Sequence, residues 1–223
     1  MMRISAEVNT LLNLLNEDID KVLEEGKVRT SLGTIDLSTS KLAILNSDGL
    51  QPKLASDLGY GAFAVCDLEP YTPILLEREL FNANSYDLYK KIDSLTAEQR
   101  KAYYNLHGHK RRETEDICAA IWRTNRFSAR PGGSVFLVAS RFNHACYQRD
   151  NVDYSFDKVK RCMVFVTKKK ISAGSELFIR YGSDPQHLYA TWGFRCTCGG
   201  CPGLSEAESK AIKPAPWIEE CEW

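Results

Sequence analysis

Two short polar stretches of the sequence carry residue types that can bind ligands or metal ions. The first, SRFNHACY at residues 140–147, follows the apolar run SVFLVA and contains Asn143, His144 and Cys146. That run is short, β-branched and aromatic and comes after the turn-forming RPGG, which predicts a buried strand. Burying an asparagine and a histidine without partners costs free energy, so either backbone groups or a ligand must satisfy them.

The second stretch, CTCGGC at residues 196–201, places three thiols within six residues. Gly199 and Gly200 allow the backbone to turn so that the sulfur atoms converge. Zinc takes four ligands in a tetrahedron, and the best remote candidate for the fourth is Cys146, because it lies in the other polar stretch. The alternative, three chance free thiols, is weaker because an exposed Cys-x-Cys-x-x-Cys oxidises readily without a metal. We therefore expect one structural zinc ion per chain, bound by Cys146, Cys196, Cys198 and Cys201.

Two further motifs are weak when taken alone. LGYGAFAV at residues 58–65 has two glycines around Tyr60, just before a predicted strand. It lacks the third glycine and the following helix of a dinucleotide fingerprint, but a close approach of its backbone to a small ligand stays open. ELFIRYG at residues 176–182 ends an alternating strand with Tyr181, which by itself indicates only an ordinary tyrosine at a strand end.

Taken together, the segments GYGAFA, SRFNHAC, ELFIRYG and GFRCTCGGC resemble, in this order and spacing, the SET-domain family of protein lysine methyltransferases. The resemblance spans residues 58–201. The long helical insert and RTNRF at residues 123–127 are most similar to the branch that includes the SMYD proteins and many fungal SET proteins. The family pattern NHSCxPN is NHACYQRDN here, and we expect neither a MYND finger nor the helical C-terminal domain of many relatives.

The resemblance implies a fold, a cofactor and a set of site residues. It implies that Tyr181 is the catalytic residue at the methyl-transfer channel and that zinc is held by the four cysteines named above. It also implies that the segments of residues 140–147 and 176–182 meet in a pseudoknot. The residues that it implies for binding S-adenosylmethionine are Leu58, Gly59, Tyr60, Asn125, Asn143, His144, Tyr181 and Phe194.

Three functions follow as alternatives. The first is transfer of a methyl group from S-adenosylmethionine to an amine, above all that of a protein lysine. The second is the same chemistry on a small-molecule acceptor, which the altered YQRDN turn and the expected absence of a C-terminal groove domain suggest. The third is a non-catalytic binding module, against which the presence of Tyr181 argues.

Periodicity predicts one mostly β domain of the α+β class, with a helical insert and helical ends. An N-terminal helix at residues 5–25 and lead-in strands are expected over residues 1–50, and the SET domain over residues 51–182, with its insert at about 84–130. A post-SET zinc segment over 183–203 and a loosely held tail over 204–223 complete the prediction. Expected strands are KLAIL, GAFAV, PILLERELF, SVFLVA, RCMVFVT and SELFIR; expected helices are LTAEQRKAYYNL, EDICAAIWRT and DPQHLYATWGF.

The charge balance argues against a polyanionic partner. Lys plus Arg and Asp plus Glu each number 29, so no overall attraction draws the chain to nucleic acid or to an anionic membrane. HGHKRR at residues 107–112 and TKKK at 167–170 are the only basic candidates, and we expect both to be solvated surface. No run of about 18 apolar residues predicts a membrane span. Scattered cysteines favour a reducing compartment, so we expect an intracellular protein, cytoplasmic or nuclear, of open oligomeric state.

Overall fold

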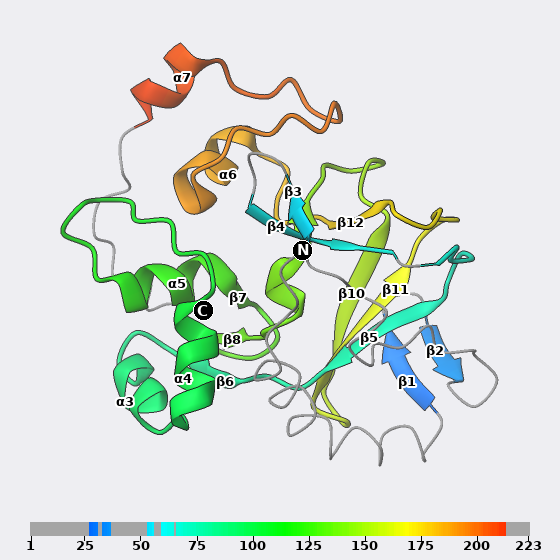
Figure 1. The fold of residues 1–223 in the computed structure, drawn as a ribbon, viewed down its shortest axis with the longest axis horizontal. Helices are drawn as coiled ribbons and strands as arrows, with labels where there is room; N and C mark the ends of the chain where they lie inside the picture. The colour runs from blue at the N-terminus through cyan, green and yellow to red at the C-terminus, as the bar shows by residue number, and fades with distance from the viewer. Residues whose placement is uncertain (1–26, 31–32, 37–52, 56–58, 65, 213–223) are drawn as a thin grey trace.

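The computed structural model describes residues 27–30, 33–36, 53–55, 59–64 and 66–212 of the 223-residue chain. The predicted N-terminal helix, the predicted strand KLAIL, and the residues Leu58 and Cys221 lie outside the described residues. In the described part, helices gather on one side of the molecule and the long antiparallel strands on the other (Figure 1). This mixture of small sheets and short helices agrees with the predicted α+β class.

Most of the described strands form three small antiparallel sheets. The first is the hairpin of β1 (Lys27–Thr30) and β2 (Gly33–Asp36). The second has the order β10 (Val152–Asp157), β11 (Cys162–Thr167), β5 (Pro73–Glu77). The third has the order β6 (Phe81–Ala83), β8 (Gly133–Val135), β7 (Arg126–Phe127).

A fourth sheet joins the segments that carry the sequence motifs. Its order is β3 (Lys53–Ala55), β4 (Gly59–Phe63), β12 (Glu176–Ile179), β9 (Asn143–His144). Strands β12 and β9 run parallel, with Phe178 opposite Asn143 and Ile179 opposite His144. The two segments that the resemblance brings together, residues 140–147 and 176–182, therefore meet through backbone pairing.

Three helices form the insert and two follow the last strand. They are α3 (Leu88–Asp93), α4 (Ala97–Tyr104), α5 (Ile117–Asn125), α6 (Pro185–Trp192) and α7 (Glu206–Ala211). Helix α4 begins after Thr96, whose side chain forms a capping box with Gln99. Helix α6 has Pro185 in its first turn, as predicted, and Asp184 as N-cap. No helix in the described part of the chain is both long and apolar enough to cross a bilayer.

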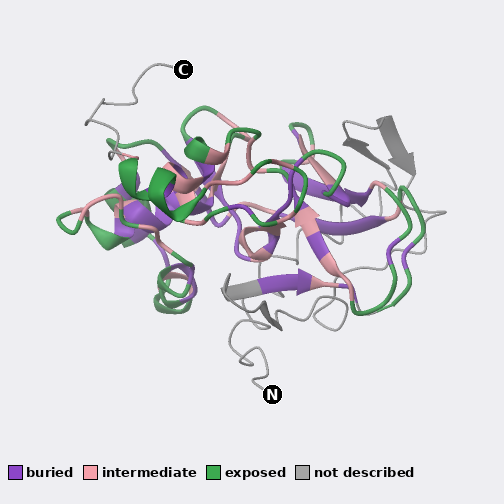
Figure 2. Ribbon diagram, turned by 90° about the horizontal axis from the view of Figure 1, so that it is seen from above, coloured by how far each residue is buried: buried purple, intermediate pink, exposed green. Residues whose placement is uncertain are grey.

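Buried residues form two main hydrophobic clusters. In the ribbon coloured by burial, buried positions run along the strands and along parts of the helices (Figure 2). One packs the insert, including Tyr103 and Ile121, against strands β6 and β8. The other packs the β-rich half around Phe142, Phe165 and Leu177. Ring stacking of Phe142 on Phe165, with centroids 4.8 Å apart, ties the segment that precedes Asn143 into this second cluster.

The predicted strand SVFLVA is wrong beyond Val135. The chain turns there into a short 3₁₀ helix, η2 (Ala139–Arg141), because the buried carboxylate of Glu77 accepts the backbone N–H groups of Val138 at 2.9 Å and Ala139 at 2.8 Å. The residues of SVFLVA after Val135 are apolar because most of them are buried, not because they form a strand; Phe136, for example, is fully buried outside any strand. An apolar run of this length cannot distinguish a strand from another buried segment.

Two other expectations need correction. PILLERELF is not one strand: it divides into β5 and β6, which belong to different sheets. The region after Cys201, predicted to be loosely held, contains helix α7. Its start is fixed by a capping box in which Ser205 and Glu208 exchange hydrogen bonds, so local capping supplies order that the composition did not indicate.

Candidate active site and cysteine cluster

Tyr181 lies at the centre of the candidate site. It follows β12 by two positions, and its backbone N–H donates a 3.0 Å hydrogen bond to Nδ1 of His144. Its hydroxyl donates to the carbonyl oxygen of Phe142 at 2.5 Å. The Tyr181 ring centroid lies 5.1 Å from that of Trp192 and 6.3 Å from that of Phe194. Residues from two other parts of the sequence, 142–144 and 192–194, thus surround one tyrosine.

His144 connects this tyrosine to the cysteine cluster. Because Nδ1 accepts from Tyr181, the ring proton of the neutral imidazole belongs on Nε2, which faces the sulfur of Cys146 at 3.4 Å. Burial lowers the pKa of His144 to about 4, although Asp150 opposes the shift, so the ring is neutral near pH 7. Both ring nitrogens therefore have partners within the protein, and a ligand at His144 would meet its backbone or its ring face.

Asn143 and the glycine segment come close together. The Asn143 side-chain amide donates a 2.7 Å hydrogen bond to the carboxylate of Glu176 on β12. Gly61 of β4 lies against this pair: a Cβ there would overlap the Glu176 carboxylate and come within 3.0 Å of the Asn143 amide nitrogen. The backbone of β4, which also contains the predicted residues Gly59 and Tyr60, therefore lies close against the Asn143–Glu176 pair.

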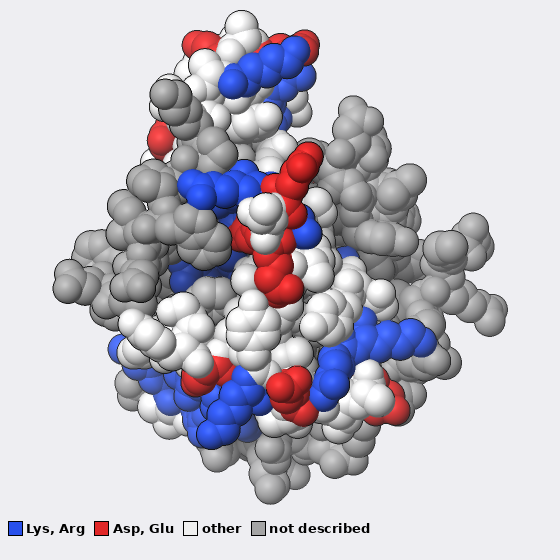
Figure 3. Space-filling view, turned by 90° about the vertical axis from the view of Figure 1, so that its left-hand side faces the viewer, with Lys and Arg blue, Asp and Glu red and all other residues white. Residues whose placement is uncertain are grey.

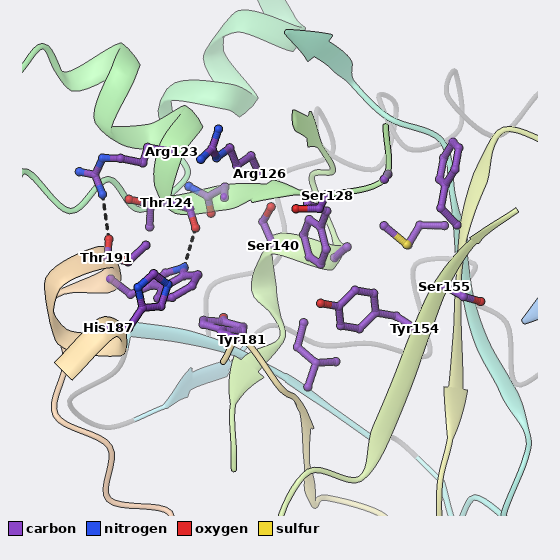
Figure 4. Close-up of a pocket in the computed structure, with 18 of the residues that line it drawn as sticks. Arg123, Thr124, Arg126, Ser128, Ser140, Tyr154, Ser155, Tyr181, His187 and Thr191 are labelled. Atoms are coloured by element: carbon purple, nitrogen blue, oxygen red, sulfur yellow. Dashed lines mark hydrogen bonds between the residues drawn. The ribbon is translucent and has the colours of Figure 1, made fainter. Parts of the chain in front are cut away.

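A cavity of about 500 Å³ opens on another side of Tyr181 (Figure 4). Of the predicted site residues, Asn125 and Tyr181 line it, whereas Asn143, His144 and Phe194 do not. Its other lining residues come from the insert, from strands β10, β11 and β12, from η2 and from helix α6. They include the cationic Arg111, Arg123 and Arg126 and the aromatic Phe127, Tyr154, Phe156 and Trp192, and none of the described residues that line it is an aspartate or a glutamate.

Asn125 can offer this cavity only a hydrogen-bond acceptor. Its amide nitrogen donates to the carbonyl oxygens of His107 at 2.6 Å and Ile121 at 2.8 Å, which uses both of its hydrogens. Because both partners are carbonyls, they also fix which end of the amide is the oxygen. A ligand at Asn125 would therefore have to present an N–H or O–H group to its Oδ1.

Tyr154 is a cavity residue that the sequence reasoning missed. It lies on β10, and its hydroxyl points into the cavity opposite Tyr181 (Figure 4). Its ring stacks on Phe165, with centroids 5.5 Å apart, and meets the edge of Phe127 at 5.4 Å. Burial raises the pKa of Tyr154, so the hydroxyl stays protonated. The polar–apolar alternation of VDYSFD was the signal that could have identified this strand.

Asn151 is a second residue whose role the sequence did not indicate. Its side-chain amide donates to the carbonyl oxygen of Glu176 at 2.8 Å, and its Oδ1 accepts the N–H of Phe178 at 2.7 Å. It thereby bonds the backbone of β12 on both sides of Leu177. Asn151 is the last residue of the altered segment NHACYQRDN, and it holds the strand that leads to Tyr181.

The four predicted zinc ligands lie together. The Sγ atoms of Cys146, Cys196, Cys198 and Cys201 are all within 4.8 Å of one another. The Cys146 and Cys196 sulfurs are 3.8 Å apart, which is about the spacing that a tetrahedral ion with metal–sulfur bonds of ~2.3 Å requires. Burial raises the pKa of the Cys198 thiol, but hydrogen bonds from the backbone N–H groups of Cys146 and Gly200 outweigh this effect, so the pKa is lowered. This donor set fits a metal ion that prefers thiolates.

Comparisons with known proteins identify the family. A SET domain family model matches residues 59–182, which is more than half of the chain. The chain therefore belongs to the SET-domain family, and its arrangement of small sheets with a few helices is the SET fold. A crystal structure of a Plasmodium falciparum protein assigned as a histone methyltransferase is similar over 61% of this chain and 95% of that chain, at 11% identity and a TM-score of 0.37. A search of curated proteins gave no match.

Proposed function

We propose that the chain is a methyltransferase that moves a methyl group from S-adenosylmethionine to an amine, that of a protein lysine. The observation that carries this proposal is the position of Tyr181. One side of the residue lines the cavity, while its ring contacts His144 and Phe194 on another side. A tyrosine in this position can meet an acceptor in the cavity and a cofactor held by the motif residues.

The residues that would hold the cofactor are those of the sequence motifs. They are Leu58, Gly59, Tyr60, Asn143, His144 and Phe194, with Asn125 reaching from the insert. The missing Cβ of Gly61 supports this assignment, because it lets the β4 backbone lie against the Asn143–Glu176 pair. When bound, the cofactor would supply a methyl group activated by its sulfonium charge.

The chemistry of Tyr181 suits an orienting role. Its hydroxyl hydrogen goes to the Phe142 carbonyl, so only oxygen lone pairs remain for a ligand. Burial raises the pKa of Tyr181 well above its ordinary value, so the hydroxyl keeps its proton at neutral pH. Tyr181 would therefore accept a hydrogen bond from the acceptor amine and fix its direction, rather than remove its proton.

The cavity lining favours the neutral amine that methyl transfer requires. Desolvation between apolar and aromatic walls disfavours a charged ammonium, and the lining carries arginines, of which Arg123 is paired with Glu115. No carboxylate among the described lining residues can pair with the ammonium form, and the oxygens of Asn125 and Tyr181 can accept hydrogen bonds from either form of the amine. A lysine that enters should therefore have a lowered pKa.

We further propose that the four cysteines bind one structural zinc ion in a post-SET segment over residues 183–203. Four thiolates fill a tetrahedral ion and leave no position for water or substrate. Cys146 lies two residues after His144, so the ion would fasten the Asn143–His144 strand to the chain that carries Phe194.

A small-molecule amine is the second candidate acceptor. The cavity volume of about 500 Å³ falls within the range of roughly 300–1,000 Å³ for small-molecule sites. Hydroxyl groups of Ser128 and Ser140 among its lining residues could orient a polar acceptor. The two acceptors differ in the product formed, so one experiment separates them.

The test has a binding arm and a product arm. Zinc-loaded protein is titrated calorimetrically with S-adenosylmethionine, and Asn143→Ala should weaken binding by roughly tenfold or more, whereas Gln186→Ala, at an exposed site on α6, should not. The protein is then incubated with methyl-labelled cofactor and cell extract, and proteins and metabolites are analysed by mass spectrometry. Label on protein lysines supports the first acceptor and label on a small amine the second. Folded, zinc-loaded protein that binds no cofactor would overturn the proposal.

A further inference from the structure

The basic segment HGHKRR, expected to be solvated surface, lies in a loop that contacts two helices. We name residues 105–116, between α4 and α5, the clasp loop. His109 and Arg111 are partly buried there, and only Lys110 and His107 of the segment are exposed. On the face of the molecule that carries the insert, basic and acidic side chains lie beside one another (Figure 3). The contacts of the loop explain its basic residues better than a polyanionic partner does.

The clasp loop holds the last turn of helix α5, which lines the cavity. The backbone N–H of His109 donates to the hydroxyl of Thr124 at 3.1 Å. The carbonyl oxygen of His107 accepts one hydrogen of the Asn125 amide at 2.6 Å. The loop therefore determines which atom Asn125 presents to the cavity.

Arg123 joins the clasp loop to helix α6. Its guanidinium donates to both carboxylate oxygens of Glu115, each at 3.0 Å, and to the carbonyl oxygens of His109 at 2.5 Å and Thr191 at 2.9 Å. Arg111 adds a 3.3 Å bond to the carbonyl oxygen of Ala190. The Arg123 and Glu115 side chains are only 11% and 12% exposed, so water screens this pair little. Two cationic side chains thus satisfy the last carbonyls of α6.

The end of α6 fits tightly against the same loop. The indole N–H of Trp192 donates to the carbonyl oxygen of Thr124 at 2.8 Å, which places the ring in the cavity wall beside Tyr181. Gly193 follows with φ of +79°, and a Cβ on it would overlap the ring of His109. Only glycine allows both this backbone conformation and this contact.

We propose that the clasp loop positions Asn125 and Trp192 in the cavity wall by holding α6 against α5, with Arg123 as the positioning residue. Without it, the two helices would be joined across the cavity mainly by the Trp192–Thr124 hydrogen bond. Trp192 lies two residues before Phe194, so the same contact also sets where the chain starts toward the cysteine cluster. Consequences for turnover rest on the proposed methyl transfer, but the positioning itself does not.

Gly193→Ala tests the contact, and the chain offers a matched control. Gly174 has φ of +80°, and a Cβ on it would meet nothing within 4 Å. Both substitutions strain a left-handed residue by a similar amount, but only Gly193→Ala pushes α6 away from His109. We expect Gly193→Ala to lower kcat/KM for the acceptor by roughly 10- to 100-fold, and Gly174→Ala to leave it within about twofold.

A second substitution distinguishes positioning from general destabilisation. His109→Ala removes the ring that a Cβ on Gly193 would strike and keeps the backbone bonds of His109 to Thr124 and Arg123. In the double variant His109→Ala, Gly193→Ala, activity should recover toward that of His109→Ala alone. A variant damaged only by backbone strain at residue 193 would gain nothing from the second change.

Arg123→Lys provides an independent test. Lysine keeps the charge but cannot bond Glu115, Thr191 and His109 together. The control is Arg161→Lys. A guanidinium nitrogen of Arg161 lies 3.8 Å from a carboxylate oxygen of Glu79, and the Arg161 side chain is 62% exposed, so this ion pair should contribute little. Hydrogen–deuterium exchange over residues 105–125 should quicken in Arg123→Lys and in Gly193→Ala, but not in either control.

The exchange measurement separates the two proposals. If the wild type binds no cofactor while both clasp variants still quicken exchange, the proposed function fails and the positioning role stands. If Gly193→Ala and Arg123→Lys match their controls in exchange and in kcat/KM, the positioning role is wrong. Failure of the double variant to recover would also contradict it.

Discussion

The hydroxyl of Tyr181 donates a 2.5 Å hydrogen bond to the carbonyl oxygen of Phe142, one residue before strand β9. The backbone of the same tyrosine donates to His144, one residue after Asn143. Tyr181 is therefore attached at two points to a single segment, and the parallel pairing of β9 with β12 sets its position. Any function of this tyrosine depends on that pairing.

Replacing Tyr181 by phenylalanine should separate catalysis from folding. Loss of a hydroxyl that orients the acceptor amine should cut turnover by roughly 30- to 1000-fold, which corresponds to ~2–4 kcal/mol at the transition state. Cofactor affinity should change little because the ring remains. The unpaired Phe142 carbonyl should lower the free energy of unfolding by about 1 kcal/mol. Initial rates, calorimetry and thermal unfolding give the three quantities.

Tyr147→Phe is the matched control, because that tyrosine is 64% exposed on the neighbouring loop. It should change neither rate nor stability. Full activity of Tyr181→Phe would remove Tyr181 from the mechanism, and a large loss of stability with normal turnover would make it a structural tyrosine at a strand end.

The sequence predicted the site best where the chemistry accepts only one type of side chain, as a zinc site made of thiolates does. Three closely spaced cysteines predicted a cluster, and the fourth member, Cys146, lies with them in the structure, where its backbone N–H donates to the sulfur of Cys198. Strands β11 and β12 and helix α6 fell near their predicted bounds, since periodicity and a proline at the helix start are local signals.

What the sequence could not indicate depends on contacts between distant residues. The run after Val135 is apolar enough for a strand, but a carboxylate 61 residues earlier in the chain bonds its N–H groups and turns it into η2. Asn151 and the clasp loop likewise acquire their roles only from partners across the fold. From residue type alone, Asn151 is an ordinary turn residue and the basic segment of the clasp loop is solvated surface.

Cys146→Ser should release the metal. Zinc content measured after gel filtration should fall well below one ion per chain, since oxygen replaces one of four thiolates. Cofactor affinity should fall with it, because Cys146 lies two residues after His144 on the same strand end. Cys66→Ser, at an exposed thiol outside the cluster, should change neither. A metal content of zero in the wild type would contradict the zinc assignment.

Asn151→Ala should destabilise the protein even though no motif marks it. The change leaves the carbonyl oxygen of Glu176 and the N–H of Phe178 without their side-chain partner, at a cost of about 2–3 kcal/mol. Chemical denaturation gives the free energy of unfolding directly. Gln186→Ala, which removes an exposed amide from α6, should lie within about 0.5 kcal/mol of the wild type. Equal stability of both variants would show that β12 does not depend on Asn151.

Glu77 should make the stability depend on pH near neutrality. Burial raises its pKa from 4.5 to about 7, although the N–H groups of Val138 and Ala139 favour the carboxylate. Because the folded-state pKa exceeds the unfolded one, this group's contribution to stability is fully present below about pH 4.5 and is lost as pH rises through 7. The free energy of unfolding should therefore lose up to about 3 kcal/mol between pH 5 and pH 8 on account of Glu77.

Glu77→Gln should flatten that part of the pH profile, because an amide has no proton to lose in this range. It should resemble the protonated wild type, with one oxygen left to accept from the η2 turn. Glu69→Gln is the control, since Glu69 is an exposed carboxylate of the neighbouring loop and its removal should leave the wild-type slope in place. Urea unfolding of the three proteins at several pH values from 5 to 8 measures the slope. If Glu77→Gln keeps the wild-type slope, another group causes it and the buried carboxyl of Glu77 is not the titrating site.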